Sequence, residues 1–303
     1  MTRHVGVYSR SLPGDDRLRQ AHDLGLDGVI FNSIAELSPT LDRAELADVK
    51  ARANALGLAL TVGVGRIHPH SDSPPDAAVL ERMVAASVEQ LGCRELWFSV
   101  AGLADRFSTD PSWPKQLAAV RHFLRGFAPI LRDHGARLNL KTHEEITSRE
   151  IVDLIEAVGP DVLGCSLDPV NLLVRLEDPL AATRRLAPHV HHVHVDDAAT
   201  YFVDEGIERK LCLMGEGVLP WPEIIAEVAA NDPWCWIELH RGQFTMPVFE
   251  DGWLVRDGVP LADFAASVRL AVEGERRIRA GAAPPPQDQP WLRFDSALRF
   301  LRP

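Results

Sequence analysis

The chain has 303 residues, with 32 Lys and Arg against 43 Asp and Glu, which gives a formal net charge of −11. This acidic balance argues against nucleic-acid binding through general electrostatics, because phosphate contacts need a basic face. No apolar run approaches the about 20 residues of a membrane span, and the four scattered cysteines are typical of reduced thiols. We therefore expect a globular cytoplasmic protein that binds neither nucleic acid nor a membrane.

Strand-like and helix-like segments alternate along the chain. Several helix-like segments end in a glycine, among them Gly25, Gly57 and Gly135, and a β-type run follows within a few residues. Glycine accepts the left-handed conformation that closes a helix. The predicted strands cover residues 4–8, 28–31, 58–64, 95–100, 137–142, 162–167, 190–195 and 234–239. The predicted helices cover residues 15–24, 41–56, 76–91, 115–134, 148–158, 179–187, 221–230 and 261–280.

This alternation predicts an α/β fold, a closed parallel (β/α)8 TIM barrel with a short C-terminal extension. An open doubly wound sheet is the alternative. It more often carries a Gly-rich phosphate turn after the first strand, and residues 9–15 are not such a turn. We expect residues 1–281 to form the barrel and residues 282–303 to form a Pro-rich spacer and an amphipathic tail segment.

Polar side chains stand at the predicted carboxyl ends of three successive strands, where barrels of this type place their active sites. Asp168 ends strand six, while His194 and Glu238 occupy inward positions on strands seven and eight. A single residue of these types is more often a loop cap or a structural histidine. Three together form a ligand set suited to Mn, Mg, Co or Zn, so the sequence predicts a divalent metal here.

Strand five ends in a second polar run. Alternation places Lys141 and His143 on the inward face, with Glu144 next along the chain. His143 titrates near neutrality and is a candidate general acid or base, although a structural hydrogen bond is the alternative. Lys141 is a candidate stabiliser of an oxyanion or, less simply, a Schiff-base nucleophile. We expect Lys141, His143 and Glu144 to be the catalytic residues.

Four further residues are candidates for binding substrate oxygens. Arg66 and His68 follow strand three, Asn171 lies just beyond Asp168, and Arg241 follows strand eight. An ordinary surface loop explains the segment of residues 65–70 equally well. We expect these four side chains to reach the same mouth of the barrel.

Six short segments in the second half of the chain resemble, in their order and spacing, the xylose isomerase-like barrel superfamily. Members of that superfamily are often labelled sugar phosphate isomerase/epimerase or AP endonuclease family 2. The segments are residues 167–171, 177–180, 186–190, 194–197, 215–217 and 236–238.

The resemblance implies a divalent metal, manganese for example, held by four side chains at the tips of strands five to eight. Asp168, His194 and Glu238 match three of these positions, but the fourth is normally a Glu and here is Lys141. The ammonium could replace the metal through an ion pair. Alternatively the metal remains and one of residues 143–145 supplies the missing ligand, which is the arrangement we expect.

The resemblance also implies an isomerase- or epimerase-like enzyme of carbohydrate metabolism that transfers a proton next to a carbonyl on a sugar or polyol-like substrate. One alternative is the catalytic subunit of a C-glycoside deglycosidase-type lyase, which would have a small partner subunit. Another is a metal-free sugar-binding barrel. A DNA repair endonuclease is disfavoured by the charge of −11 and by Lys141. The C-terminal tail could serve a homo-oligomer interface.

Overall fold

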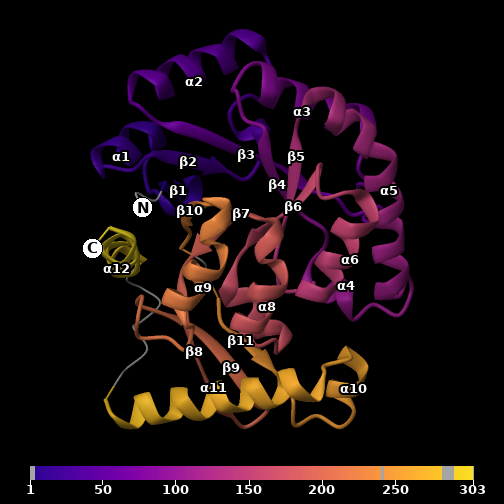
Figure 1. Ribbon diagram of the computed structural model, residues 1–303, viewed down its shortest axis with the longest axis vertical. Coiled ribbons are helices and arrows are strands. Elements are labelled where there is room, and N and C mark those ends of the chain that lie inside the picture. The colour runs from indigo at the N-terminus through magenta and orange to yellow at the C-terminus, as the bar shows by residue number, and fades with distance from the viewer. Residues whose placement is uncertain (1–3, 240–241, 282–289, 303) are drawn as a thin grey trace.

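The computed structural model describes residues 4–239, 242–281 and 290–302 (Figure 1). Eight parallel strands close into a barrel in the order β1-β10-β7-β6-β5-β4-β3-β2, which confirms the predicted α/β barrel. The strands are β1 (Val5–Tyr8), β2 (Gly28–Phe31), β3 (Ala59–Arg66), β4 (Glu95–Ser99), β5 (Arg137–Lys141), β6 (Leu163–Leu167), β7 (Val190–Val195) and β10 (Trp234–Ile237). Each ends within two residues of its predicted limits.

Indole rings fill the interior of the barrel. Trp97 of β4 and Trp236 of β10 form an internal apolar cluster with Ile30 of β2. Gly6 on β1 leaves room for this packing, because a Cβ at that position would lie 2.1 Å from the Trp236 ring. The interior is therefore a packed core, as is usual for this type of barrel.

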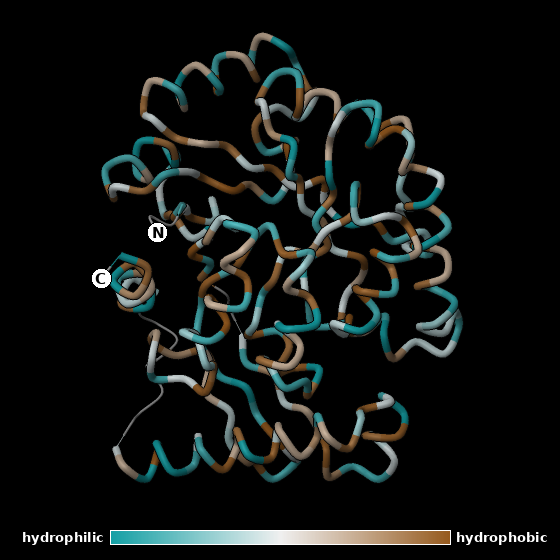
Figure 2. Tube along the Cα trace, viewed as in Figure 1, coloured by the Kyte–Doolittle hydropathy of each residue, from teal (hydrophilic) through white to brown (hydrophobic). Residues whose placement is uncertain are grey.

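Amphipathic helices cover the outside of the barrel. Along α5, hydrophobic and hydrophilic segments alternate in the tube of Figure 2, as expected for a helix with one buried face. This helix ends at Gly135, whose φ of 59° is the left-handed conformation expected from the sequence. The helices that alternate with the barrel strands are α1 (Arg17–Asp23), α2 (Arg43–Ala55), α3 (Ala77–Glu89), α5 (Trp113–His134), α6 (Ser148–Val158), α8 (Pro179–Leu186) and α9 (Trp221–Val228), and two short helices, α4 (Leu103–Arg106) and α7 (Pro169–Leu172), precede α5 and α8.

A small antiparallel sheet lies beside the barrel and was not predicted. Its strands are β8 (Asp197–Val203), β9 (Gly206–Cys212) and β11 (Phe244–Met246), in the order β11-β9-β8. After α10 (Trp253–Asp257), the long helix α11 (Leu261–Arg279) runs along β8, as Figure 1 shows. The helix predicted over residues 261–280 thus exists, but it packs on this sheet.

The last helix, α12 (Pro290–Leu301), packs against the barrel wall near β10 and the N-terminus (Figure 1). Phe294, Ala297 and Leu301 belong to the main hydrophobic core. Arg302 donates to Asp27 Oδ2 at 2.7 Å. Within the described ranges, no helix is both long enough and apolar enough to cross a membrane.

Candidate active site

A buried ion cluster occupies the carboxyl end of the barrel. Lys141, the last residue of β5, points its Nζ at both carboxylate oxygens of Glu238, each 2.8 Å away. The same nitrogen lies 3.1 Å from Asp168 Oδ2. The side chains of Lys141 and Asp168 are 4% and 0% exposed. Strands β5, β6 and β10 therefore bring together one cation and two anions away from water.

His194 of β7 completes the cluster. Its Nδ1 contacts Glu238 Oε2, and its Nε2 lies 2.7 Å from Ser166 Oγ on the neighbouring strand. Burial and the charge of Lys141 lower the pKa of His194, despite the opposing charge of Glu238. The imidazole is therefore neutral at neutral pH, with both ring nitrogens next to polar atoms.

The carboxylates keep Lys141 charged. Burial acts to lower the pKa of Lys141, but the charges of Glu238 and Asp168 outweigh it and raise that pKa above its ordinary value. The ammonium also lies 5.6 Å from the Trp97 ring centroid, a cation–π distance. The site thus presents a permanent positive charge in a surrounding of low dielectric, where it acts strongly on any developing negative charge.

Two side chains hold Asp168 in place. The Thr142 hydroxyl donates to the Asp168 carbonyl at 3.0 Å and accepts from the Asp168 N–H at 2.6 Å. Asn171 Nδ2 donates to Asp168 Oδ2 at 3.0 Å and to the Thr142 carbonyl at 3.1 Å. The structure therefore places Asn171, which was predicted to bind substrate, where its amide orients Asp168.

His143 belongs to a separate acidic group beside the cluster. Its Nδ1 contacts Glu145 and lies 2.8 Å from Glu144 Oε2. Glu145 is fully buried and also accepts the Ala101 N–H at 3.1 Å. Burial acts to lower the pKa of His143, but the hydrogen bonds and charges of the two glutamates raise it to about 10. At neutral pH His143 therefore carries a proton, which suits an acid better than a base.

The predicted metal can be tested against these donors. Asp168, His194 and Glu238 do converge, but they converge on Lys141, and its ammonium takes up the space between the carboxylates. A divalent ion there would sit against a like charge, so this arrangement does not fit a four-ligand metal centre. One atom from each of residues 143–145 could share an ion, since these atoms lie within 4.8 Å of one another. The His143 Nδ1 already contacts both glutamates.

The remaining predicted residues lie apart from the described contacts of the cluster. Arg66 is exposed, and His68 is buried with its Nε2 2.9 Å from Gln116 Oε1 on α5. His68 therefore joins the segment after β3 to a surrounding helix. Arg241 lies outside the described residues. His192, the other inward histidine of β7, packs edge-on against Trp236 with centroids 6.1 Å apart.

Sequence reasoning missed two residues of the site. Tyr8, at the end of β1, has its pKa raised to about 12 by burial and by the charge of Glu238. An aromatic residue with a hydroxyl at the predicted end of a barrel strand is a sequence signal that could have identified Tyr8 as a site residue. Arg209 on β9 is fully buried near the barrel mouth. No sequence signal connected it to the site, because its strand had not been predicted.

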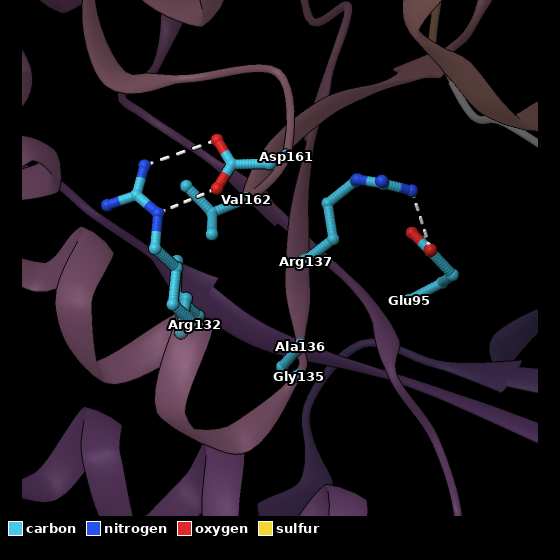
Figure 3. A pocket seen from close by; sticks show the side chains of 8 residues that line it. Glu95, Arg132, Gly135, Ala136, Arg137, Asp161 and Val162 are labelled. Atoms are coloured by element: carbon cyan, nitrogen blue, oxygen red, sulfur yellow. Dashed lines mark hydrogen bonds and ion pairs between the residues drawn. The ribbon is translucent and has the colours of Figure 1, made fainter.

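A pocket lies at the opposite end of the barrel from this cluster (Figure 3). It is lined by two ion pairs, Arg132 with Asp161 at 2.6 Å and Arg137 with Glu95 at 2.8 Å. Glu95 and Arg137 are the first residues of β4 and β5, whereas Lys141 is the last residue of β5. The charges that line this pocket already pair with one another, so the site with unusual chemistry is the Lys141 cluster.

Comparisons with known proteins agree with this architecture. The chain is 28% identical over 97 residues to the uncharacterized protein YihM of Escherichia coli (strain K12), covering 32% of this chain and 30% of YihM. It is 24% identical over 204 residues to the 3-oxo-isoapionate decarboxylase of Pectobacterium atrosepticum, covering 67% of this chain and 66% of that protein. The matches thus span less than two thirds of either relative.

A solved structure shows the same fold at low identity. A D-psicose 3-epimerase from Clostridium cellulolyticum H10, determined with D-tagatose, superposes with a TM-score of 0.60 at 17% identity, covering 90% of this chain and 98% of that one. The family model of the xylose isomerase-like TIM barrel matches residues 18–255. That range includes every residue of the Lys141 cluster, and the chain therefore belongs to the family of xylose isomerase-like TIM barrels.

Proposed function

We propose that this protein is an isomerase- or epimerase-like enzyme that transfers a proton next to the carbonyl of a sugar or polyol-like substrate. The observation that carries the proposal is the Lys141 ammonium, fixed 2.8 Å from Glu238 and 3.1 Å from Asp168 at the barrel mouth. A carbonyl oxygen that reached this ammonium would gain a fixed positive charge just where an enediolate develops negative charge. The fold family supports a substrate of this type.

The chain supplies groups for each proton movement. The carboxylate of Glu238 removes the proton on carbon, and the C–H electron pair moves to the carbonyl oxygen, which Lys141 stabilises. Protonated His143 donates a proton to a substrate oxygen and later takes a proton back from the same substrate, so that His143 ends in its starting state. Return of the proton from Glu238 to the adjacent carbon isomerises the sugar, whereas epimerisation needs a second acid, for which protonated His143 is the candidate, to protonate the opposite face of the same carbon while Glu238 keeps the proton that it removed.

A lyase is the second candidate, and Lys141 is the observation that favours it. Elimination or decarboxylation also passes through an enolate, which an ammonium stabilises without help from a metal. The likeness to a 3-oxo-isoapionate decarboxylase supports this class, at 24% identity. A C-glycoside deglycosidase-type subunit belongs to the same class.

Solvent deuterium exchange tests the common step of these reactions. The protein is incubated in D2O with panels of aldoses, ketoses, keto-sugars and sugar acids, and NMR follows loss of the proton next to the carbonyl. We expect at least one panel member to exchange. Lys141→Met and Glu238→Gln should each slow that exchange by about 100-fold or more, as removal of an oxyanion donor or a general base does.

Arg132→Ala is the matched control, because Arg132 is an exposed ion-pair residue at the far end of the barrel. It should exchange at the wild-type rate. If sugars bind but none exchanges or loses a group, the protein is a binding barrel and the enzyme proposal is wrong. Product analysis of the exchanging substrate separates isomerase from lyase.

A further inference from the structure

Arg209 is a buried cation that the proposed reaction leaves unused. Its exposure is 0%, and its Nε and Nη1 have no hydrogen-bond partner in the part of the chain that the structure describes. Its Cζ lies 4.8 Å from the centroid of the Phe244 ring, so that ring covers one side of the guanidinium. Unused N–H groups on a buried charge lower stability unless another molecule binds them.

The residue opposite Arg209 on the neighbouring strand is also buried, and it also has a polar atom without a hydrogen-bond partner among the described residues. Thr200 on β8 pairs with Arg209 on β9, is 2% exposed, and has an Oγ1 with no partner within residues 4–239, 242–281 and 290–302. Residues directly opposed in an antiparallel pair point to one face of the sheet, with their Cβ atoms about 5 Å apart. A buried guanidinium and a buried hydroxyl, both with unused hydrogen-bonding atoms, thus lie side by side.

This pair lies next to the barrel mouth. Strand β8 begins two residues after β7 ends, so the small sheet leaves the barrel at the carboxyl end of a strand (Figure 1). Ile207, on the same face of β9 as Arg209, belongs to the same buried hydrophobic cluster as Leu176, which follows the short segment after Asp168. Burial lowers the pKa of Arg209, and the charges of Glu144 and Asp168 oppose that effect. Arg209 is therefore within electrostatic reach of both acidic groups.

We propose that Arg209 and Thr200 bind an anionic group of the substrate, a carboxylate or a phosphate, while its carbonyl end reaches Lys141. A guanidinium presents parallel N–H groups that match the oxygens of either anion, and a hydroxyl adds a further donor. This inference takes its substrate from the proposed function, but anion binding is measured without turnover. An experiment can therefore reject anion binding without rejecting the proposed function, and the reverse is also possible.

The test compares wild-type protein with Arg209→Met and Thr200→Val by thermal denaturation and calorimetry. The probes are D-gluconate for a carboxylate, D-glucose 6-phosphate for a phosphate, and D-glucose as the neutral control. We expect one anionic probe to raise the melting temperature of the wild type and glucose to have no effect. Arg209→Met should bind that probe about tenfold more weakly or worse, and Thr200→Val should have a smaller effect. The probe that binds shows whether the anionic group of the substrate is a carboxylate or a phosphate.

The unliganded variants separate a binding role from a structural one. Methionine fills much of the volume of Arg209 without its unused N–H groups, so unliganded Arg209→Met should melt at or above the wild-type temperature. A lower melting temperature would mean that Arg209 serves as a structural cation for the nearby carboxylates, and it would overturn the proposal. Equal binding of gluconate, glucose 6-phosphate and glucose, or no binding of either anion, would overturn it too. If substrates exchange deuterium at rates that do not depend on an anionic group, the anion-binding proposal is wrong and only the proposed function remains supported.

Discussion

Lys141 and Glu238 are 97 positions apart in the sequence, yet the Lys141 Nζ lies 2.8 Å from both carboxylate oxygens of Glu238. Strands β6 and β7 stand between their strands in the barrel order. The ion pair therefore spans the mouth of the barrel and links strands that share no backbone hydrogen bonds. The Lys141 ammonium thus holds the tips of these strands together.

Lys141→Met should destabilise the protein strongly. It leaves the carboxylates of Asp168 and Glu238 buried without their shared cation, and removing one partner of a buried pair costs about 3–5 kcal/mol. The free energy of unfolding from urea denaturation measures this loss. The double variant Lys141→Met/Glu238→Gln should recover part of it, whereas equal losses in the single and double variants would show that the ion pair contributes little.

Lys141→Glu should create a metal site. The substitution supplies the fourth ligand, a third carboxylate, that the resemblance to the family implies, and it removes the cation between Asp168 and Glu238, with His194 as the nitrogen ligand. We expect the variant to bind about one Mn²⁺ per chain and to gain thermal stability when Mn²⁺ is added. Elemental analysis and thermal denaturation measure both effects.

The wild type and Lys141→Gln are the controls for that metal experiment. We expect the wild type to bind Mn²⁺ far more weakly than Lys141→Glu, because its own ammonium repels the ion. Lys141→Gln removes the charge without adding a ligand and should lie between them. Stoichiometric metal in the wild type that is lost in Asp168→Ala would instead support a retained metal with a ligand from residues 143–145.

The contribution of His143 to stability should depend on pH. Its pKa in the folded protein is raised to about 10 from an ordinary 6.5, so the folded state binds this proton more tightly than the unfolded state. The contribution is therefore complete below pH 6.5 and is lost as the pH rises from 6.5 to 10. His143→Gln should lower the free energy of unfolding by about 1–3 kcal/mol at pH 6, and by much less near pH 10.

Denaturation at the two pH values measures this difference. A His143→Gln variant whose deficit is the same at both would contradict an ion pair with Glu144 and Glu145. The same substitution in a Glu144→Gln background should have a smaller effect, because one partner of the proton is already gone.

Phe294→Ala should destabilise the barrel as much as a substitution inside it. Phe294 is 0% exposed and belongs to the main core, although it stands on the last helix. Loss of a buried phenylalanine costs about 3–5 kcal/mol. Trp291→Ala, three positions earlier on the same helix and 40% exposed, is the matched control and should cost far less. If Phe294→Ala lost as little free energy of unfolding as Trp291→Ala, α12 would not form part of the barrel wall.

The strands and helices of the barrel could be predicted because local signals mark them. Helix α5 ends at Gly135 in a left-handed conformation, and β5 begins two residues later, as the sequence pattern indicated. The small sheet was missed, although residues 204–205 form a short polar turn between two β-rich runs, which is a hairpin signal.

Only the part of the site that follows from the alternation of side chains along the barrel strands could be predicted. Parity placed Lys141, Asp168 and Glu238 together, because these residues stand at the ends of barrel strands. It could not show that His143 turns to its own neighbours, since that depends on the bend of the chain after β5. Arg209 lay beyond such reasoning, because only the pairing of β8 with β9 places it near the barrel.

The position of α12 has a consequence for the order in which the barrel is assembled. Strand β1 pairs with β10, and α12 then covers this junction, while Arg302 bonds to Asp27 from the start of the chain. Strand β1 is made well before β10 and α12, so it lacks one neighbour and its outer cover until those distant segments have also left the ribosome. Closure of the barrel is a late event, and the unpaired edge of β1 needs protection until then.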